Sequence, residues 1–440
     1  MYSDRHLCPL PMPSRRSFLQ RTLLTGTALG TGAALPSLAS DSSVRSSRAR
    51  RAPDTPTDEA LKKILEQPVL RRELIADPVV IESMDLLKNG DTWFARARSS
   101  DGAEGYAVSN WSMPTFWPVF VGHVGPYFEG KDVRDLDRLV QLCFEAGSHY
   151  KMQSMAIWAP IATAEFAALD LLGRVSDRSV RELLGPPARD EIEIYWANNF
   201  RGQSAEESVR RVAERYEANR PPAVKVKVGG RMSAEEEPAG RSERMIPMLR
   251  ERLGEDVVIY ADANGGYDVE EAIRIGRMLE EIGAGFFEEP VPFDHLWETK
   301  EVADALEIPV AAGEQESSMR RFRWMVANDG AQVLQPDLFY YGGLTRSIKV
   351  ARMAEAAGRP CTAHVSGGDM GMLYIVHFAS IVENSGPHQE YKNPSSEIPF
   401  EMPGARLEPQ RGRIPAPEGR GLGVRFDPDW IAASTVIEGT

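Results

Sequence analysis

The sequence lacks the features that mark several large classes of protein. Its three cysteines, Cys8, Cys143 and Cys361, are too few and too scattered for a disulfide framework or a thiolate metal site. The 51 Lys and Arg residues are outnumbered by 64 Asp and Glu residues, and the net charge of −13 argues against nucleic-acid binding. No apolar run of about 18 residues, the length that spans a bilayer, follows the first forty residues. We therefore expect free thiols, no nucleic-acid partner, no membrane span and, with 42% hydrophobic residues, a large ordinary core.

The N-terminus has the layout of an export signal. Arg15 and Arg16 form a twin-arginine pair, Phe18 and Leu19 follow, and a weakly apolar stretch ends in Ser37-Leu38-Ala39, which offers small residues for cleavage. The pattern predicts a twin-arginine (Tat) signal peptide over residues 1–39 and delivery to the periplasm or beyond. The alternative is a basic tail without structure. Residues 40–58, rich in Ser, Arg, Pro and Asp, predict a flexible linker.

The next part of the chain changes from extended to helical patterns. Between Val79 and Ala107 the residues alternate as in a hairpin, with a turn signal at Asn89-Gly90-Asp91. From Val133 to Gly185 apolar residues recur at helical spacing, and Gly173 is a plausible helix end. We predict an α+β capping domain over residues 59–190, with the C-terminal segment of about 405–440 packing back on it.

Residues 191–404 alternate short apolar segments with amphipathic ones. The candidate strands are Ile192–Ala197, Val224–Val228, Val257–Ala261, Gly285–Glu288, Val310–Gly313, Gln332–Gln335, Pro360–Ala363 and Gln389–Tyr391. Asp268 to Gly283 illustrates the intervening helices, with a capping signal at its start and a glycine at its end. Eight such units in a row predict an α/β fold with a (β/α)8 catalytic barrel, and a doubly wound sheet is the competing possibility.

Charged residues occupy the C-terminal ends of these strands, where a buried parallel strand should be apolar. They are Lys225, Lys227, Asp262, Glu288, Glu289, Glu314, Asp337, His364 and Glu390. Their spacing is about one βα unit from Lys227 onward. Any one of them alone could be a helix cap or a solvated charge. Because the strand ends of a barrel meet at one face, the set predicts a single active-site mouth.

The two lysines share one face of their strand. Lys225 and Lys227 alternate with three valines, so if the valines pack against helices, both ammonium groups point into the barrel. Crowding and partial desolvation lower the pKa of an ammonium group. A lysine there becomes a usable base near neutral pH.

Three carboxylates and a histidine pair complete the predicted site. Asp262, Glu288 and Glu314 come from consecutive strands and form a hard oxygen site suited to Mg²⁺, with Mn²⁺ as an alternative. A divalent cation there would stabilise the negative charge that develops when a proton is removed next to a carboxylate. Asp337 and His364 can form a carboxylate–imidazole pair that fixes the histidine tautomer.

These motifs, in this order and spacing, resemble the enolase superfamily. Within it they resemble the mandelate-racemase-like branch of the mandelate racemase and muconate lactonizing enzyme family, from about Val79 to Val424. The resemblance implies a barrel with a capping domain, Mg²⁺, and removal of the proton next to a carboxylate through an enediolate. Its small-molecule partner would be a carboxylate, and we also expect a homo-oligomer.

The resemblance also implies a role for each residue. In Val-Lys-Val-Lys-Val-Gly, Lys227 matches the family's base, and Lys225 matches the partner that contacts the substrate carboxylate and depresses the pKa of that base. The metal ligands correspond to Asp262, Glu288 (rather than Glu289) and Glu314. The second acid–base pair and the residue that hydrogen-bonds the enediolate oxygen correspond to His364, Asp337 and Glu390.

This sequence differs from other branches of the family at two places, which narrows the choice of branch. Asn264 stands where galactonate- and mannonate-dehydratase-like members carry His, and no lysine lies between Gln335 and Gly343, where cycloisomerase-like members place one. Both favour the type with a His–Asp pair. We expect a hydro-lyase that dehydrates a sugar acid to a 2-keto-3-deoxy acid. The alternatives are a racemase or epimerase of a 2-hydroxy acid, and an exported barrel that binds a ligand without catalysis.

Substrate choice would depend on two capping-domain segments, Leu86–Phe94 and Asn110–Phe120. Their aromatic residues are Trp93, Trp111, Phe116 and Trp117. These side chains could form a lid over the substrate or serve as packing between the two domains.

Overall fold

The computed structural model describes residues 55–367, 369–392, 398–403 and 406–439. The predicted export signal, 1–39, and residues 40–54 of the predicted linker lie outside the described residues. Helix α1 (Asp58–Glu66) begins at the end of the predicted linker, where the side chain of Thr57 accepts a hydrogen bond from the backbone of Ala60. This is an ordinary N-cap, which satisfies one of the free N–H groups of the first turn.

The N-terminal part is built on a small antiparallel sheet. Its strands are β1 (Ile81–Asn89), β2 (Thr92–Ser99) and β3 (Glu104–Val108), joined by β14 (Thr435–Val436) in the order β14-β1-β2-β3. The predicted turn lies between β1 and β2, where Gly90 has a φ of +55°. The helices are α2 (Met113–Val119), α3 (Gly125–Phe128), α4 (Leu136–Glu145), α5 (Met155–Val175) and α6 (Val180–Leu184). Short helical turns are η1 (Arg72–Leu74), η2 (Phe120–Val124), η3 (Val133–Asp135) and η4 (Ala146–Lys151).

Helix α5 is the core of this part of the chain. Its 21 residues make it the one described helix that is long and apolar enough to cross a membrane, but 89% of that apolar window is buried inside the protein. The expectation that Gly173 ends this helix is wrong, because the helix continues to Val175. A Cβ on Gly173 would lie 2.5 Å from the Cα of Gly421. The glycine is there so that the C-terminal segment can approach the helix closely.

The barrel is a curled parallel sheet surrounded by helices. Its strands are β4 (Glu191–Ala197), β5 (Ala223–Lys227), β6 (Val258–Asp262), β7 (Phe286–Glu288), β8 (Val310–Ala312), β9 (Val333–Leu334) and β10 (Gln389–Tyr391). They pair in parallel in the order β10-β4-β5-β6-β7-β8-β9. Because β4 pairs with the last strand of the series as well as with its successor, the sheet has barrel rather than doubly wound topology. The (β/α)8 fold with a capping domain is confirmed.

One predicted strand is wrong in detail. Residues 360–363 form no strand, and that segment is held by isolated parallel bridges, Leu334 to Cys361 and Asp337 to His364. The segment includes Pro360, which has no N–H to donate to a ladder. The bridges still place His364 beside Asp337.

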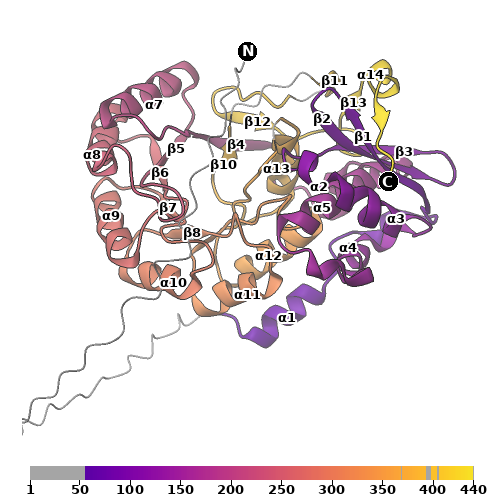
Figure 1. The fold of residues 1–440 in the computed structure, drawn as a ribbon, viewed down its shortest axis with the longest axis horizontal. Helices are drawn as coiled ribbons and strands as arrows, with labels where there is room; N and C mark the ends of the chain where they lie inside the picture. The colour runs from indigo at the N-terminus through magenta and orange to yellow at the C-terminus, as the bar shows by residue number, and fades with distance from the viewer. Residues whose placement is uncertain (1–54, 368, 393–397, 404–405, 440) are drawn as a thin grey trace, which may run out of the picture. The chain divides into compact units, whose positions relative to one another are not determined.

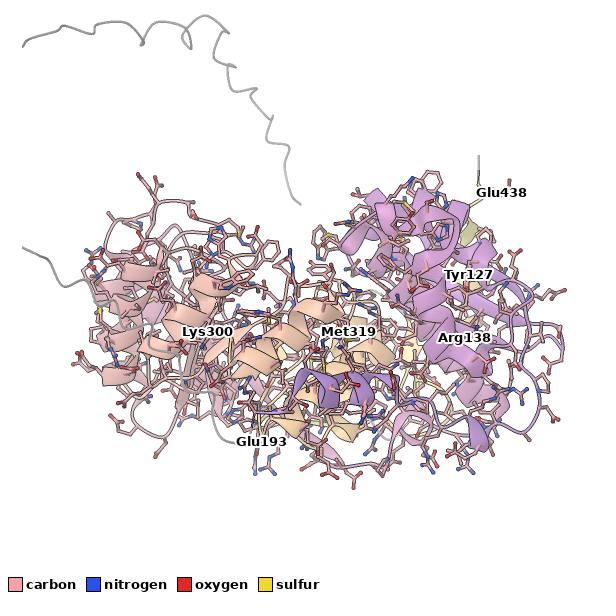
Figure 2. All side chains as sticks on the ribbon, turned by 90° about the horizontal axis from the view of Figure 1, so that it is seen from below. Tyr127, Arg138, Glu193, Lys300, Met319 and Glu438 are labelled. Atoms are coloured by element: carbon pink, nitrogen blue, oxygen red, sulfur yellow. The ribbon has the colours of Figure 1, made fainter. Side chains whose placement is uncertain are left out.

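Helices follow the strands around the barrel. They are α7 (Ala205–Asn219), α8 (Arg241–Leu253), α9 (Val269–Glu281), α10 (Leu296–Ala305), α11 (Met319–Asn328), α12 (Leu344–Ala356) and α13 (Asp369–Ile381). Figure 1 shows α7 to α10 along the outside of β4 to β8. In Figure 2, Lys300 of α10 lies at the opposite end from Tyr127 and Arg138 of the N-terminal part, with Met319 of α11 between them.

The C-terminal segment contacts both parts of the fold. It contains β11 (Phe400–Glu401), β12 (Arg413–Pro415), β13 (Arg425–Phe426) and α14 (Pro428–Ala432). Strand β12 pairs with barrel strand β4, whereas β14 pairs with β1 and Trp430 stacks on Phe94 at 4.8 Å between ring centroids. The domain boundaries given above stay predictions.

Candidate active site and metal centre

The three predicted metal ligands meet at the mouth of the barrel. Lys227, Asp262 and Glu288 are neighbours across β5, β6 and β7, because Lys227 pairs with Asp262 and Asp262 pairs with Glu288. Glu314 follows β8 by two residues. The carboxylates of Asp262, Glu288 and Glu314 each offer an oxygen within 4.8 Å of the others, and all three residues are buried. Such a hard, oxygen-only donor set fits Mg²⁺.

The lysine pair lies on the inner face of β5, as the alternation predicts. The valines of β5 pack with residues of α7, α8 and α9, whereas Lys225 is 0% exposed and Lys227 is 7% exposed inside the barrel. The Nζ atom of Lys225 lies 2.8 Å from Glu288 and 3.0 Å from Glu390, and Lys227 donates to Asp262.

The expectation of a lowered lysine pKa is wrong for Lys225. Burial acts to lower its pKa, but Glu288 and Glu390 outweigh this, and the pKa lies well above its usual value. An ammonium between two carboxylates is favoured in its charged form. Lys225 is therefore held as a cation among these side chains.

The predicted histidine pair is formed. His364 Nδ1 lies 2.6 Å from Asp337 Oδ2, which assigns the proton to Nδ1 and leaves Nε2 facing Glu314 at 3.2 Å and Glu390 at 3.3 Å. Asp337 also accepts hydrogen bonds at 2.8 Å from the backbone N–H groups of Phe339 and Tyr340. The pair is anchored to the backbone that leads into α12.

Burial and neighbouring charge act in opposite directions on the carboxylates. Burial and the Asp262 carboxylate raise the pKa of Glu288 to about 8, and burial and Glu314 hold the pKa of Glu289 well above its usual range. For Glu390 burial is outweighed by Lys225 and Lys392, so its pKa lies well below the usual range. Concentrated acidic groups of this kind are stabilised by cations.

A cavity of about 780 Å³ opens at this mouth. Lys227, Glu314, His364 and Glu390 line it, whereas Lys225 is 0% exposed and is not among the lining residues. Trp111 also lines the cavity and is 65% exposed.

The other aromatic side chains of the two capping segments lie elsewhere. Trp93 and Trp117 pack against the hydrophobic core, and Phe116 is not among the residues that line the cavity. Of the four, Trp111 is the one placed to contact a ligand.

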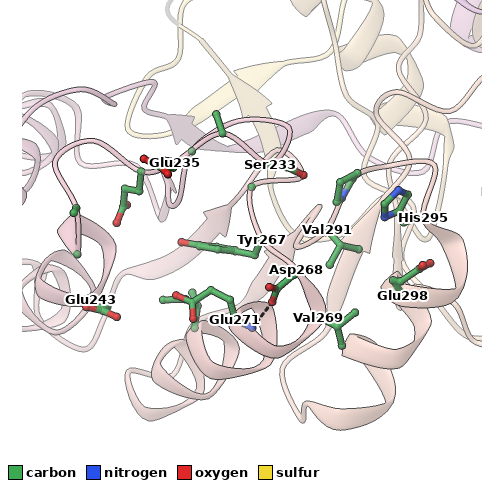
Figure 3. A pocket seen from close by; sticks show the side chains of 18 residues that line it. Ser233, Glu235, Glu243, Tyr267, Asp268, Val269, Glu271, Val291, His295 and Glu298 are labelled. Carbon is green, nitrogen blue, oxygen red and sulfur yellow. Dashed lines mark hydrogen bonds between the residues drawn. The ribbon is translucent and has the colours of Figure 1, made fainter. Parts of the chain in front are cut away.

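A second cavity, of about 630 Å³, lies beside the loops that follow β5, β6 and β7 (Figure 3). Acidic residues line much of it, but Glu243 and Glu271 form ion pairs with Arg274, and Asp268 caps α9. None of the sequence-predicted site residues lines this cavity. The chemistry therefore centres on the first cavity.

Comparison with known proteins agrees with this geometry. The family model described as "Enolase C-terminal domain-like" matches residues 207–430. This chain belongs to that family. A solved structure of a mandelate racemase/muconate lactonizing protein from Paracoccus denitrificans PD1222, complexed with magnesium, is 29% identical. Its TM-score is 0.74, and the match covers 82% of this chain and 100% of that one.

Two sequence relatives of this enolase-family chain are named as sugar-acid dehydratases. The arabinonate dehydratase of Saccharolobus solfataricus is 28% identical over 299 residues, which cover 68% of this chain and 78% of the relative. The L-rhamnonate dehydratase of Saccharopolyspora erythraea is 26% identical over 352 residues, which cover 77% of this chain and 84% of the relative.

Sequence reasoning missed one residue of this enolase-family site. The Nζ atom of Lys392 lies 3.0 Å from His364 Nε2 and 3.0 Å from Glu390. The signal was available, because Glu390 and Lys392 are two apart and period-two geometry places them on one face.

Sequence reasoning also underrated Asn264, which it used only to separate branches of the family. Its amide nitrogen lies 3.3 Å from Asp262 and 3.3 Å from Glu314, and its oxygen accepts from Arg201 at 3.0 Å. Asn264 orients two of the candidate metal ligands, a supporting contact that no motif spacing predicts.

Proposed function

We propose that this protein is a Mg²⁺-dependent hydro-lyase that dehydrates a sugar acid to a 2-keto-3-deoxy acid. The observation that carries the proposal is the cavity lined by both Lys227 and His364. Lys227 on β5 and His364 on the bridged segment after Pro360 can reach one bound substrate from different sides, beside a group of buried carboxylates. The dehydratase names of the two sequence relatives support the choice of reaction.

The proposed metal ligands are Asp262, Glu288 and Glu314. Their donor chemistry fits Mg²⁺, and Mn²⁺ is a second candidate with similar ligand preferences. When bound, the cation would stabilise negative charge that develops on the substrate carboxylate. Asn264 and Gln335, which donate to these carboxylates, would hold them in place.

The proton transfers are assigned to the residues that line the cavity. Lys227 takes the proton from the carbon next to the substrate carboxylate, and His364 delivers a proton to the β-hydroxyl as its C–O bond breaks. Water leaves, and the resulting enol becomes the 2-keto-3-deoxy acid. Asp337 holds the imidazole. A hydrogen bond from Glu390 to the enediolate oxygen requires the protonated form of Glu390, whereas Lys225 and Lys392 hold its pKa low and favour the carboxylate. Lys225 supplies positive charge near the substrate carboxylate from behind the cavity wall.

A racemase or epimerase is the second candidate, because the same two bases could exchange roles on opposite faces of the α-carbon. The test is incubation in D₂O with MgCl₂ and a panel of sugar acids that includes arabinonate and L-rhamnonate, followed by NMR and mass spectrometry. We expect loss of water and a 2-keto-3-deoxy product. Deuterated stereoisomers that retain every hydroxyl would favour the racemase instead. Full activity in excess chelator would contradict the metal assignment.

The His364→Asn variant separates the two roles of the bases. In a dehydratase this variant loses product but can still exchange the α-hydrogen through Lys227 if reprotonation competes. In a racemase it exchanges only the stereoisomer that Lys227 faces. If the barrel binds a ligand without catalysis, neither the wild type nor the His364→Asn variant should exchange the α-hydrogen.

We also propose that the protein is exported by the twin-arginine route and assembles as a homo-oligomer. Arg15 and Arg16, followed by Phe18 and Leu19, support the first part. Replacing both arginines with lysine should retain the chain in the cytoplasm, as cell fractionation would detect. Export of the doubly substituted chain would contradict this. Light scattering of the purified protein tests the oligomeric state.

A further inference from the structure

A chain of hydrogen bonds links the capping segment to the histidine pair. Asn110 Nδ2 donates to Ser366 Oγ at 2.9 Å, and Ser366 Oγ donates to Asp337 Oδ1 at 3.1 Å. The other oxygen of Asp337 holds His364 Nδ1 at 2.6 Å. All four side chains are buried. A change at Asn110 can therefore reach His364 through two intervening side chains.

The direction of each hydrogen bond is fixed by its neighbours. The Oδ1 atom of Asn110 accepts from the backbone N–H of Ser112 at 3.1 Å and from its hydroxyl at 2.6 Å, so the amide nitrogen must face Ser366. Ser366 has a single hydroxyl proton. That proton goes to the Asp337 carboxylate, which only accepts, and the hydroxyl oxygen is left to accept from Asn110.

The hydrogen-bond chain begins at Asn110, in the capping segment that contributes Trp111 to the cavity. Asn110 lies between β3 and α2 and directly precedes Trp111, which lines the 780 Å³ cavity. Ser366 and His364 line the same cavity from the barrel side. The segment that would contact a substrate is thus hydrogen-bonded to the carboxylate that orients the proposed acid.

We propose that Asn110 is a positioning residue that couples the capping segment to His364 through Ser366 and Asp337. This inference rests on the proposed function. With Asn110 and Ser366 in place, the Asp337 carboxylate is held at Oδ1 by Ser366 and by two backbone N–H groups, and it fixes the plane of the imidazole. When the segment is displaced, Ser366 loses the hydrogen bond from Asn110 that holds its hydroxyl in place, and the restraint that this hydroxyl puts on Asp337 weakens. Proton delivery by His364 then slows.

Among the described residues, the proposed base Lys227 makes no hydrogen bond to any of the four side chains of this hydrogen-bond chain. The ammonium group of Lys227 donates instead to Asp262, which belongs to β6 and is not part of the hydrogen-bond chain. Loss of Asn110 should therefore impair removal of the β-hydroxyl more than exchange of the α-hydrogen. A general loosening of the capping domain would instead reduce both together.

The experiment measures both processes in D₂O with MgCl₂ and arabinonate or L-rhamnonate. The variants are Asn110→Ala, Ser366→Ala and the double substitution. Ser109→Ala is the matched control, because Ser109 precedes Asn110 and is buried, but its hydroxyl pairs with Thr163 at 2.9 Å rather than with the chain to Asp337.

We expect each single variant to lower the kcat of dehydration by about tenfold, the usual loss for such a supporting contact, with α-deuterium exchange and KM within about twofold. The double variant should be no worse than Ser366→Ala, because both residues act through one chain. The control should resemble the wild type. An unchanged ratio of exchange to dehydration in Asn110→Ala, in an active wild-type background, overturns this inference alone. A wild type that neither exchanges nor dehydrates either acid contradicts the proposed function as well.

Discussion

Two groups of buried carboxylates in this protein differ in their spacing and in their hydrogen-bond donors. In helix α5, Glu165 and Asp170 are each 0% exposed, and each accepts hydrogen bonds from two backbone N–H groups. At the barrel mouth, Asp262, Glu288 and Glu314 are also buried, and each offers an oxygen within 4.8 Å of the others. The first group is spread along the helix and the second converges on a point.

The difference lies in where the donors come from. Glu165 accepts from the backbone N–H groups of Leu344 and Thr345 at 2.7 and 2.8 Å, which lie at the start of α12 and so join the capping part to the barrel. Backbone donors at a helix start are preorganised and need no further partner. At the mouth, Asp262 and Glu288 instead pair with the ammonium groups of Lys225 and Lys227, and Glu314 accepts from the side-chain amides of Asn264 and Gln315. Carboxylates that face ammonium and amide side chains can exchange these partners for a bound cation, whereas Glu165 is engaged by the backbone and hydroxyl donors at the start of α12.

Among the substitutions that test this contrast, one at Lys227 should have the largest effect on activity. Lys227→Met should reduce exchange of the α-hydrogen by about 10²–10⁴-fold, the usual contribution of a general base, without unfolding the barrel. Lys300→Met on α10 is the control, because Lys300 forms its ion pair in the described part of the chain with Asp304, one turn along the same helix. NMR of the α-hydrogen in D₂O measures both. Exchange at the wild-type rate in Lys227→Met would remove this residue from the mechanism.

Two of the buried histidines, His377 and His364, extend the comparison to pH. His377 in α13 donates through Nε2 to the carbonyl of Leu422 at 3.0 Å, and burial lowers its pKa to about 4. Because the unfolded residue binds a proton below about pH 6.5 and the folded one does not until about 4, acidification through this window favours unfolding. The loss should reach about 3 kcal/mol at the acidic end.

Urea unfolding between pH 7 and pH 4 tests that prediction. His377→Gln keeps an N–H donor without a titrating ring, so its stability should fall less than that of the wild type over the same range. Parallel pH curves for the two proteins would show that His377 does not contribute. In the folded protein His364 behaves differently: burial lowers its pKa, but Glu314 and Glu390 overcome this and raise it.

Much of this arrangement could be predicted from the sequence because it follows from the period of a strand. Alternation placed the β5 valines against the helices and Lys225 and Lys227 inside, and parallel order placed Asp262 and Glu288 side by side. The spacing of one βα unit between the other charged residues predicted that they also lie at the mouth of the barrel.

Contacts that cross between elements could not be predicted in this way. The bond from Asn110 to Ser366 spans 256 residues, and no local pattern records it. The raised pKa of Lys225 depends on Glu390, which reaches it because β10 pairs with β4. The segment 360–363 looks like a strand by composition, yet it forms only single bridges because such short pairing is decided by its neighbours.

The smallest effects are expected from the same chemical change made at two sites, Glu314→Gln and Glu165→Gln. At Glu314 the change removes a charge from the crowded group, so Mg²⁺ should bind about tenfold more weakly while stability in the absence of the cation is unchanged or higher. At Glu165 it should leave Mg²⁺ affinity unaltered and cost about 1–3 kcal/mol, because the amide nitrogen would face a backbone N–H of α12 that needs an acceptor. Calorimetric titration with MgCl₂ and urea unfolding measure the two quantities on each variant. If both variants lose Mg²⁺ affinity equally, the capping helix and the barrel mouth are not the independent groups that their donors indicate. If neither does, the metal centre does not include Glu314.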